Sequence, residues 1–213
     1  GMEGGTAMAQ VLCGQVNPSG KLADTFAARL EDYPSTENFH ESVEYVDYTE
    51  DIYVGYRYFE TIPGAAEKVV YPFGYGLSYT TFEVETQKAW EEADSINVQV
   101  KVTNTGDMAG KEVVQLYYSA PQGLLKKPAK ELGAFKKTRL LQPGESHTMV
   151  LTVTKEAMAS YDDLGKVAKS AYVLEKGAYA FYIGTSVRNN EKTAYEYLVA
   201  EDTVVKQLEA KLT

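Results

Sequence analysis

The feature that most constrains how this chain can fold is a pair of tyrosine-rich segments interrupted by glycines. The first covers residues 46–59, with the sequence VDYTEDIYVGYRYF, and the second covers residues 71–82, with the sequence YPFGYGLSYTTF. Glycine lets the backbone turn sharply or approach another segment closely, and tyrosine combines a large apolar surface with one hydroxyl. So many aromatic rings are not typical of a solvated loop. We therefore predict that these segments form a tightly packed junction between larger structural units.

The C-terminal half of the chain has the pattern of a mainly β fold. Apolar residues stand at every second position from 96 to 102 and lead into the turn sequence NTG at 104–106. Similar short segments separated by turn residues follow, which indicates an antiparallel β-sandwich. Tyr179 also resembles the tyrosine of a tyrosine corner, whose hydroxyl bonds back to the chain upstream. The predicted strands are 96–102, 114–118, 132–140, 148–153, 172–174, 179–183 and 195–199.

The N-terminal part is predicted to be a mixed α/β, largely irregular extension. Apolar residues between 7 and 12 follow helical spacing, and Gly14 stands where a helix C-terminal cap is expected. The sequence NPSG at 17–20 then predicts a turn. One short helix and a long irregular path bury too little apolar surface to offset the entropy of ordering about 80 residues. The extension is therefore expected to need a neighbouring unit to pack against.

The last segment changes pattern again. Val204, Val205, Leu208 and Leu212 share one face of a helical projection, so we predict a terminal or linker helix over 201–213. This helix either docks on the sandwich or leads into a further domain.

Several motifs, in order along the chain, resemble glycoside hydrolase family 3, the β-glucosidase group. Residues 1–22, which end in NPSGKL, resemble the end of the family's α/β sandwich domain. Residues 52–59 and 72–82 resemble the linker that follows, and motifs between 102 and 145 resemble the family's fibronectin type III-like domain. The resemblance implies the tail of the α/β sandwich domain and linker over 1–87, a fibronectin type III/immunoglobulin-like β-sandwich over 88–200, and the terminal segment 201–213.

The resemblance also implies where the chemistry of the parent protein lies. Retaining hydrolysis uses a nucleophilic carboxylate and an acid/base carboxyl group about 5 Å apart. In the family the aspartate belongs to a barrel and the glutamate to an upstream part of the α/β sandwich domain, and no residue here matches either position. Glu3 lies near a predicted helix start, where a carboxylate usually serves the helix dipole. We therefore predict no catalytic, cofactor-binding or metal-binding residue in this chain, and no cofactor.

Six residues of the tyrosine-rich segments are candidates for the rim of a sugar site or for an inter-domain contact. Aromatic faces suit the apolar face of a pyranose, but packing between domains is the favoured role of these tyrosines. The carboxylates of Glu50 and Asp51 are expected to be structural, paired with Arg57 or with backbone donors. The six candidates are Glu50, Asp51, Tyr53, Arg57, Tyr58 and Tyr75.

The composition restricts the partners and the compartment. A formal net charge of −9 argues against nucleic acid, and no run of about 18 apolar residues predicts a membrane span. The only cysteine, Cys13, is expected to be a buried, inert thiol, and it favours a reducing, cytoplasmic setting. The source is expected to be bacterial. His40 and His147 lack zinc-ligand spacing, and the adjacent Asp162 and Asp163 predict a turn.

We expect this chain to be a non-catalytic structural module that buttresses the catalytic domains of a retaining β-glucosidase-type enzyme acting on β-linked glucosides or xylosides. The alternatives are a sandwich that itself binds carbohydrate and a free-standing protein-interaction module. The expected partners are the barrel and the α/β sandwich domain of the same polypeptide. A minority arrangement in the family places the barrel after the fibronectin-like domain, so residues 204–212 either lead into such a barrel or form a terminal helix.

Overall fold

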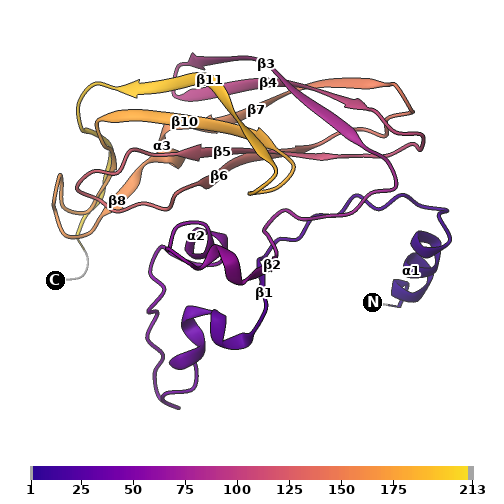
Figure 1. Ribbon diagram of the computed structural model, residues 1–213. Coiled ribbons are helices and arrows are strands. Elements are labelled where there is room, and N and C mark those ends of the chain that lie inside the picture. Colours follow the sequence, from indigo (N-terminus) through magenta and orange to yellow (C-terminus); the bar gives the residue numbers. More distant parts are fainter. Residues whose placement is uncertain (1, 211–213) are drawn as a thin grey trace.

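The computed structural model describes residues 2–210. Its main body is the predicted antiparallel β-sandwich, whose two sheets face each other across an apolar core (Figure 1). One sheet has the strand order β3-β4-β7 and the other has the order β11-β10-β5-β6. The strands are β3 (Phe82–Glu92), β4 (Ser95–Asn104), β5 (Val113–Ser119), β6 (Glu131–Lys137), β7 (Ser146–Thr154), β10 (Gly177–Gly184) and β11 (Asn190–Val199).

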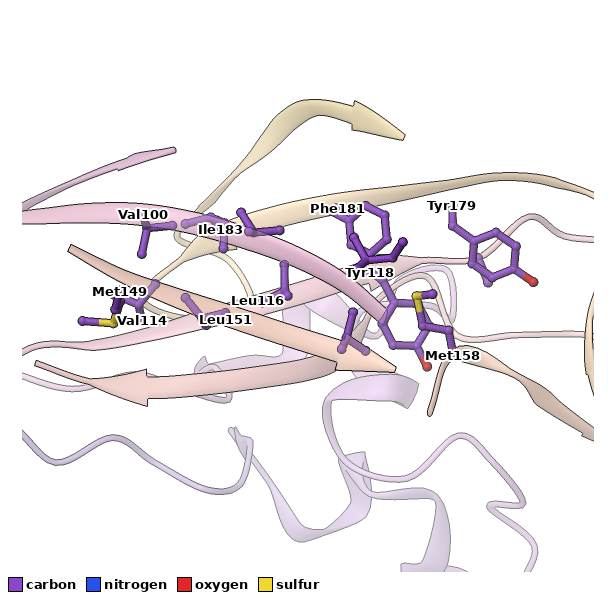
Figure 2. Packing of buried hydrophobic residues seen from close by; sticks show 14 of the residues in the cluster. Val100, Val114, Leu116, Tyr118, Met149, Leu151, Met158, Tyr179, Phe181 and Ile183 are labelled. Atoms are coloured by element: carbon purple, nitrogen blue, oxygen red, sulfur yellow. The ribbon is translucent and has the colours of Figure 1, made fainter. Parts of the chain in front are cut away.

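The core confirms the alternation seen in the sequence. Every second residue of β4 from Ile96 to Val102 is completely buried, because successive side chains of a strand point to opposite faces. Side chains of β5, β7 and β10 meet them between the sheets, among them Leu116, Leu151 and Ile183 (Figure 2). Truncating one such side chain to alanine typically costs about 2–5 kcal/mol, so this core dominates the stability of the sandwich.

The tyrosine corner is confirmed. Tyr179 of β10 is completely buried, and its hydroxyl donates a hydrogen bond to the Glu175 carbonyl oxygen at 3.3 Å. The bond ties the start of β10 to the turn before it, as in other sandwiches of this kind.

A smaller sheet of order β12-β9-β8 lies beside the sandwich. It consists of β8 (Ser160–Asp162), β9 (Ala171–Leu174) and β12 (Thr203–Gln207), and the short helix α3 (Lys155–Met158) precedes β8. The predicted terminal helix is therefore wrong over its described part. Val204 pairs with Val173 of β9, and this neighbouring strand satisfies backbone groups that a short isolated helix satisfies poorly. Residues 211–213 lie outside the described residues.

The sandwich also begins earlier than expected. The boundary between residues 87 and 88 falls inside β3, which starts at Phe82 and pairs with β4 from Asn104 to Ser95. β3 is an edge strand with a bulge between Thr86 and Lys88, and several of its side chains are charged and exposed. The alternation of apolar and polar residues in β3 is therefore weak, and pairing with β4 decides the conformation of this strand.

The extension is irregular, as predicted. No residue of its helix α1 is buried. The chain leaves α1 through Gly14, whose φ is +70°. The expected burial of Cys13 is wrong, because Cys13 is exposed where α1 lies uncovered. The elements are α1 (Gly4–Leu12), β1 (Phe26–Ala27), η1 (Leu30–Asp32), η2 (Pro34–Glu37), α2 (Tyr56–Phe59), η3 (Ala66–Lys68) and β2 (Val69–Tyr71).

Candidate functional site

The end of the first tyrosine-rich segment and the start of the second pack on the outer face of the sheet β11-β10-β5-β6, whereas Tyr48 in the first segment is largely exposed. The ring of Tyr56 in α2 lies 4.6 Å from that of Phe73 and meets the buried ring of Tyr117 in β5 edge-on at 6.3 Å. We call these three residues the aromatic junction. The neighbours of Tyr117 along β5 point into the sandwich core, so β5 is covered on both faces.

Hydrogen bonds lock the aromatic junction in place. The Leu132 amide donates to the Tyr56 hydroxyl at 2.9 Å, and the Ala129 amide donates to the Thr61 hydroxyl at 2.8 Å. The amide of Val187, which follows β10, donates to the carbonyl of Phe73 at 3.1 Å. A tyrosine hydroxyl satisfied in this way is typical of a buried contact.

The backbone approaches the sheet most closely at Gly74. Its φ is +82°, and a Cβ there would lie 2.6 Å from the Gln115 side chain and 2.9 Å from the Ser186 Cα. The Tyr117 hydroxyl donates to Gln115 Oε1, and Gln115 Nε2 donates to the Thr185 carbonyl at 3.1 Å. Burial, together with the nearby Tyr56 and Glu60, raises the pKa of Tyr117 well above its usual range. The hydroxyl therefore stays protonated and serves as a donor.

Ion pairs surround the aromatic rings. Arg188 Nε lies 2.8 Å from Glu60 Oε1, and its Nη2 donates to the Ala66 carbonyl at 2.9 Å. Arg57 pairs with Glu131 of β6 at 3.3 Å. These contacts join α2 and η3 to the sandwich at several separate points.

Asn17 connects the NPSG turn to two further segments. Its Nδ2 donates to the Ala109 carbonyl at 3.1 Å, while its Oδ1 accepts from the Ser78 hydroxyl at 3.0 Å and from the Tyr79 amide at 2.9 Å. The NPSG turn is thus attached both to the second tyrosine-rich segment and to the loop after β4.

Among the predicted site residues, Tyr58 and Tyr75 lie in packing positions. The Tyr58 ring packs on Phe59 at 5.2 Å, and the Tyr75 ring packs on Tyr71 at 5.1 Å. Tyr53 is half-buried.

Arg57 is paired with Glu131 and not with Glu50 or Asp51, so that form of the expected pairing is wrong, and pairing of these carboxylates with backbone donors stays a prediction. Asp51 is exposed at a φ of +52°, and the carbonyl of Glu50 accepts the Tyr53 amide at 2.9 Å. A place at the rim of a sugar site stays a prediction for all six candidates.

Sequence reasoning missed the residues that make the closest contacts, namely Tyr56, Phe73, Gln115, Tyr117 and Arg188. Tyr56 and Phe73 stand inside the motifs already singled out, next to Gly55 and Gly74. The partners on β5 gave a weaker signal, a continuous run of large residues that is typical of a strand covered on both faces.

The sandwich has a groove of about 850 Å³ along the seam between the edge strands β3 and β11. Its polar lining includes Gln87 and Thr193, but its aromatic residues, Phe82 and Tyr195, pack against the sandwich core. These rings therefore contribute to the packing of the core more than to a surface on which a sugar could stack.

Within residues 2–210, no group of three or more His, Cys, Asp or Glu side chains is arranged to hold a metal ion. None of the helices in this part of the chain combines the length and the apolar character needed to cross a membrane.

Much of the apolar surface of the extension is exposed. Met8 and Leu12 of α1 are 65% and 75% exposed. A soluble monomer rarely leaves so many apolar side chains uncovered in one region unless the region is an interface. Other exposed apolar residues of the extension are Val16, Leu30, Phe39, Val43, Tyr45, Tyr48 and Val54.

In comparison with known proteins, two family models match separate parts of this chain. Residues 1–79 match the glycosyl hydrolase family 3 C-terminal domain, and residues 112–187 match the fibronectin type III-like domain. β-Glucosidase A of Butyrivibrio fibrisolvens is 62% identical over 100% of this chain and 27% of its own length. A β-glucosidase of Ruminococcus albus is 46% identical over 100% of this chain and 22% of its own length.

Solved structures show the same arrangement. The crystal structure of a β-glucosidase from Paenibacillus barengoltzii is similar with a TM-score of 0.93 at 55% identity, over 97% of this chain and 23% of that chain. β-Glucosidase 3B from Thermotoga neapolitana has a TM-score of 0.85 at 42% identity, over 96% of this chain and 28% of that chain. This chain thus spans about a quarter of the length of these relatives. It belongs to glycosyl hydrolase family 3, of which it carries C-terminal domain sequence together with the fibronectin type III-like domain.

Proposed function

We propose that this chain is a non-catalytic structural module of a β-glucosidase-type family 3 enzyme and that it buttresses the catalytic parts of that enzyme. The observation that carries the proposal is the uncovered apolar surface of α1, which contrasts with the closed core of the sandwich. Burying this surface against the rest of the polypeptide stabilises the assembly by roughly 25 cal/mol per Å² of apolar area removed from water. The sandwich contributes a rigid base, and the aromatic junction holds the extension on it.

The substrate of the parent enzyme follows from its relatives. Those compared above are named β-glucosidases, so we propose β-linked glucosides as the substrates of the parent. Both carboxyl groups of the reaction would come from parts of the polypeptide outside this chain. A reducing, cytoplasmic setting stays a prediction, and a barrel after residue 213 stays one of the alternatives for the terminal segment.

The experiment has two arms. The isolated chain is expected to show no hydrolysis of an aryl β-glucoside above background, since it lacks both matching carboxyl positions. In the intact parent enzyme, the double substitution Met8→Asp/Leu12→Asp is expected to lower the thermal midpoint and the activity together. Turnover by the repurified chain, or a parent enzyme indifferent to the α1 substitutions, would contradict the proposal.

A further inference from the structure

The acidic charge of this protein is concentrated in one exposed part of the extension, residues 30–51, which we call the acidic lobe. It contains eight acidic residues and neither lysine nor arginine, so it carries a formal charge of −8 within a chain of −9. In Figure 1 it projects beyond α2, on the side away from the sandwich. Its acidic residues are Glu31, Asp32, Glu37, Glu41, Glu44, Asp47, Glu50 and Asp51.

The acidic lobe is held in shape by its own hydrogen bonds. Asn38 Nδ2 donates to the Asp47 carbonyl at 2.7 Å and closes the loop between them. The Tyr33 hydroxyl donates to the Thr25 carbonyl at 2.9 Å, and the Tyr33 ring packs edge-on against Phe59 at 5.5 Å. Through Tyr33 the lobe is therefore anchored beside α2.

A mainly apolar pocket of about 350 Å³ opens on the acidic lobe. Phe39 at its edge is 63% exposed, and its ring contacts the His40 ring at 4.6 Å. A mainly apolar pocket of this kind within an acidic segment suits one large apolar side chain of a partner with a polar rim around it. The pocket is lined by Leu30, Tyr33, Ser35, Thr36, Phe39 and His40.

We propose that the acidic lobe docks on a basic-rimmed apolar surface of the same polypeptide, in the portion outside this chain, and that an aromatic or aliphatic side chain of that surface enters the pocket. The inference rests on the proposed structural function and names the chemistry of its partner. About three-quarters of the length of the relatives lies outside the aligned region. A corresponding portion of the same polypeptide would be a large, covalently linked partner for the lobe. Covalent linkage raises the effective concentration of that partner far above that of any free protein.

The charge of the acidic lobe determines which kinds of partner can bind it. A second copy would bring another lobe of charge −8 and repel the first, and nucleic acid is repelled in the same way. A surface carrying lysine and arginine around an apolar centre meets both the carboxylates and the exposed rings of the lobe. Asp32 already has an ion-pair partner in Lys68 at 3.4 Å, which leaves the outer carboxylates of the loop for such a surface.

Hydrogen exchange in the intact parent enzyme and in the isolated chain tests the proposal. Amides of residues 36–50 are expected to exchange at least about tenfold more slowly in the parent, and about 0.5 M salt is expected to reduce this protection. Phe39→Asp is expected to abolish the protection. The triple substitution Glu41→Gln/Glu44→Gln/Asp47→Asn is expected to weaken it and to remove its salt dependence. Phe135→Asp is the matched control, because Phe135 on β6 is 66% exposed and lies outside the lobe.

Three outcomes would overturn the proposal: equal exchange of the lobe in parent and isolated chain, equal effects of Phe39→Asp and Phe135→Asp, or protection of the isolated chain that grows with its concentration. The last outcome would identify a second copy as the occupant. Protection of α1 in the parent without protection of the lobe would overturn only this inference and leave the proposed function intact. Loss of both would remove the proposed function as well.

Discussion

Lys127 and Glu175 form an ion pair in which both side chains are almost completely buried. Glu175 also accepts the amide of Leu124 at 2.6 Å, and Lys127 Nζ donates to the Leu125 carbonyl at 2.9 Å. The pair thus fixes the loop after β5 against the turn between β9 and β10. Taking two charges out of water is expensive, and their attraction repays the cost only when both partners are present with further hydrogen bonds.

Lys127→Met is expected to destabilise the chain by roughly 3–5 kcal/mol, because it leaves the Glu175 carboxylate buried without a cation. The double substitution Lys127→Met/Glu175→Gln is expected to recover part of the loss, since no unpaired charge then remains. Urea unfolding of both variants measures the difference. A double variant no more stable than the single one would show that lost packing, and not the unpaired charge, causes the effect.

Asp162 fixes a second loop and confirms the turn predicted at this position. Its buried carboxylate accepts backbone N–H bonds from Gly165 and Lys166 through Oδ1 and from Val167 and Ala168 through Oδ2. Burial alone raises the pKa of this carboxyl group, but the four hydrogen bonds outweigh it and hold the pKa below its usual range.

The lowered pKa makes the contribution of Asp162 dependent on pH. It is complete above the unfolded-state pKa, near 4, and is lost as the pH falls through the lower folded-state pKa. Asp162→Asn is expected to cost about 1–3 kcal/mol at pH 7 and to flatten the decline of stability in acid. Urea midpoints between pH 7 and pH 3 check this, with the exposed Asp163→Asn as the control. Equal pH profiles for the two variants would contradict the assignment.

At the scale of elements, backbone geometry decides how the second tyrosine-rich segment meets the sandwich. Gly64 and Gly74 have nearly the same left-handed φ, +79° and +82°. A Cβ would meet nothing within 4 Å at Gly64, whereas at Gly74 it would overlap Gln115 and the backbone of Ser186. Alanine substitutions at the two glycines therefore distinguish two costs. At Gly64 the cost comes from the left-handed backbone conformation alone, and at Gly74 the steric overlap adds to it.

Gly64→Ala is expected to cost about 1 kcal/mol through the left-handed conformation alone. Gly74→Ala is expected to cost more and to loosen residues 52–80 from the sheet, because the overlap pushes Phe73 away from Tyr56. Limited proteolysis of this segment, together with the urea midpoint, measures the two effects. Equal behaviour of the two variants would show that the close approach at Gly74 contributes little.

At the scale of the whole molecule, the sandwich and the extension differ in how they are held. The sandwich has its own continuous core, whereas the extension depends on the aromatic junction, on Asn17 and on a few ion pairs. Residues 4–50 have few buried side chains. Local stability follows the number of buried contacts and protected hydrogen bonds.

The isolated chain is accordingly expected to show slow amide exchange in β4, β5 and β10, intermediate exchange near α2, and fast exchange over residues 4–50. Time-resolved hydrogen exchange with peptide-level readout measures this gradient. Uniformly slow exchange over residues 4–50 would mean that the extension is ordered without its partner.

Much of this architecture was predictable from local pattern. The strands β4, β5 and β10 have strict alternation or dense apolar character, and the tyrosine corner and the Asp162 turn depend on nearby residues. The junction was predictable as a packed region because glycine lets the backbone approach another segment closely and tyrosine has a large apolar surface to bury. Its actual partners, Gln115 and Tyr117, lie more than 40 residues away from Phe73 along the chain, so no local pattern names them.

The amino-acid sequence by itself determined the family, the sandwich and the position of the junction, because these depend on motif order and on the period of the strands. Tertiary structure decided the rest. The segment that begins at Val204 forms β12 because β9 offers a free edge, and β3 reaches back to Phe82 because β4 pairs with it. Arg57 pairs with Glu131 because packing of α2 brings them together. Cys13 is exposed because α1 lies uncovered, and burial depends on what surrounds a helix as well as on its own apolar spacing.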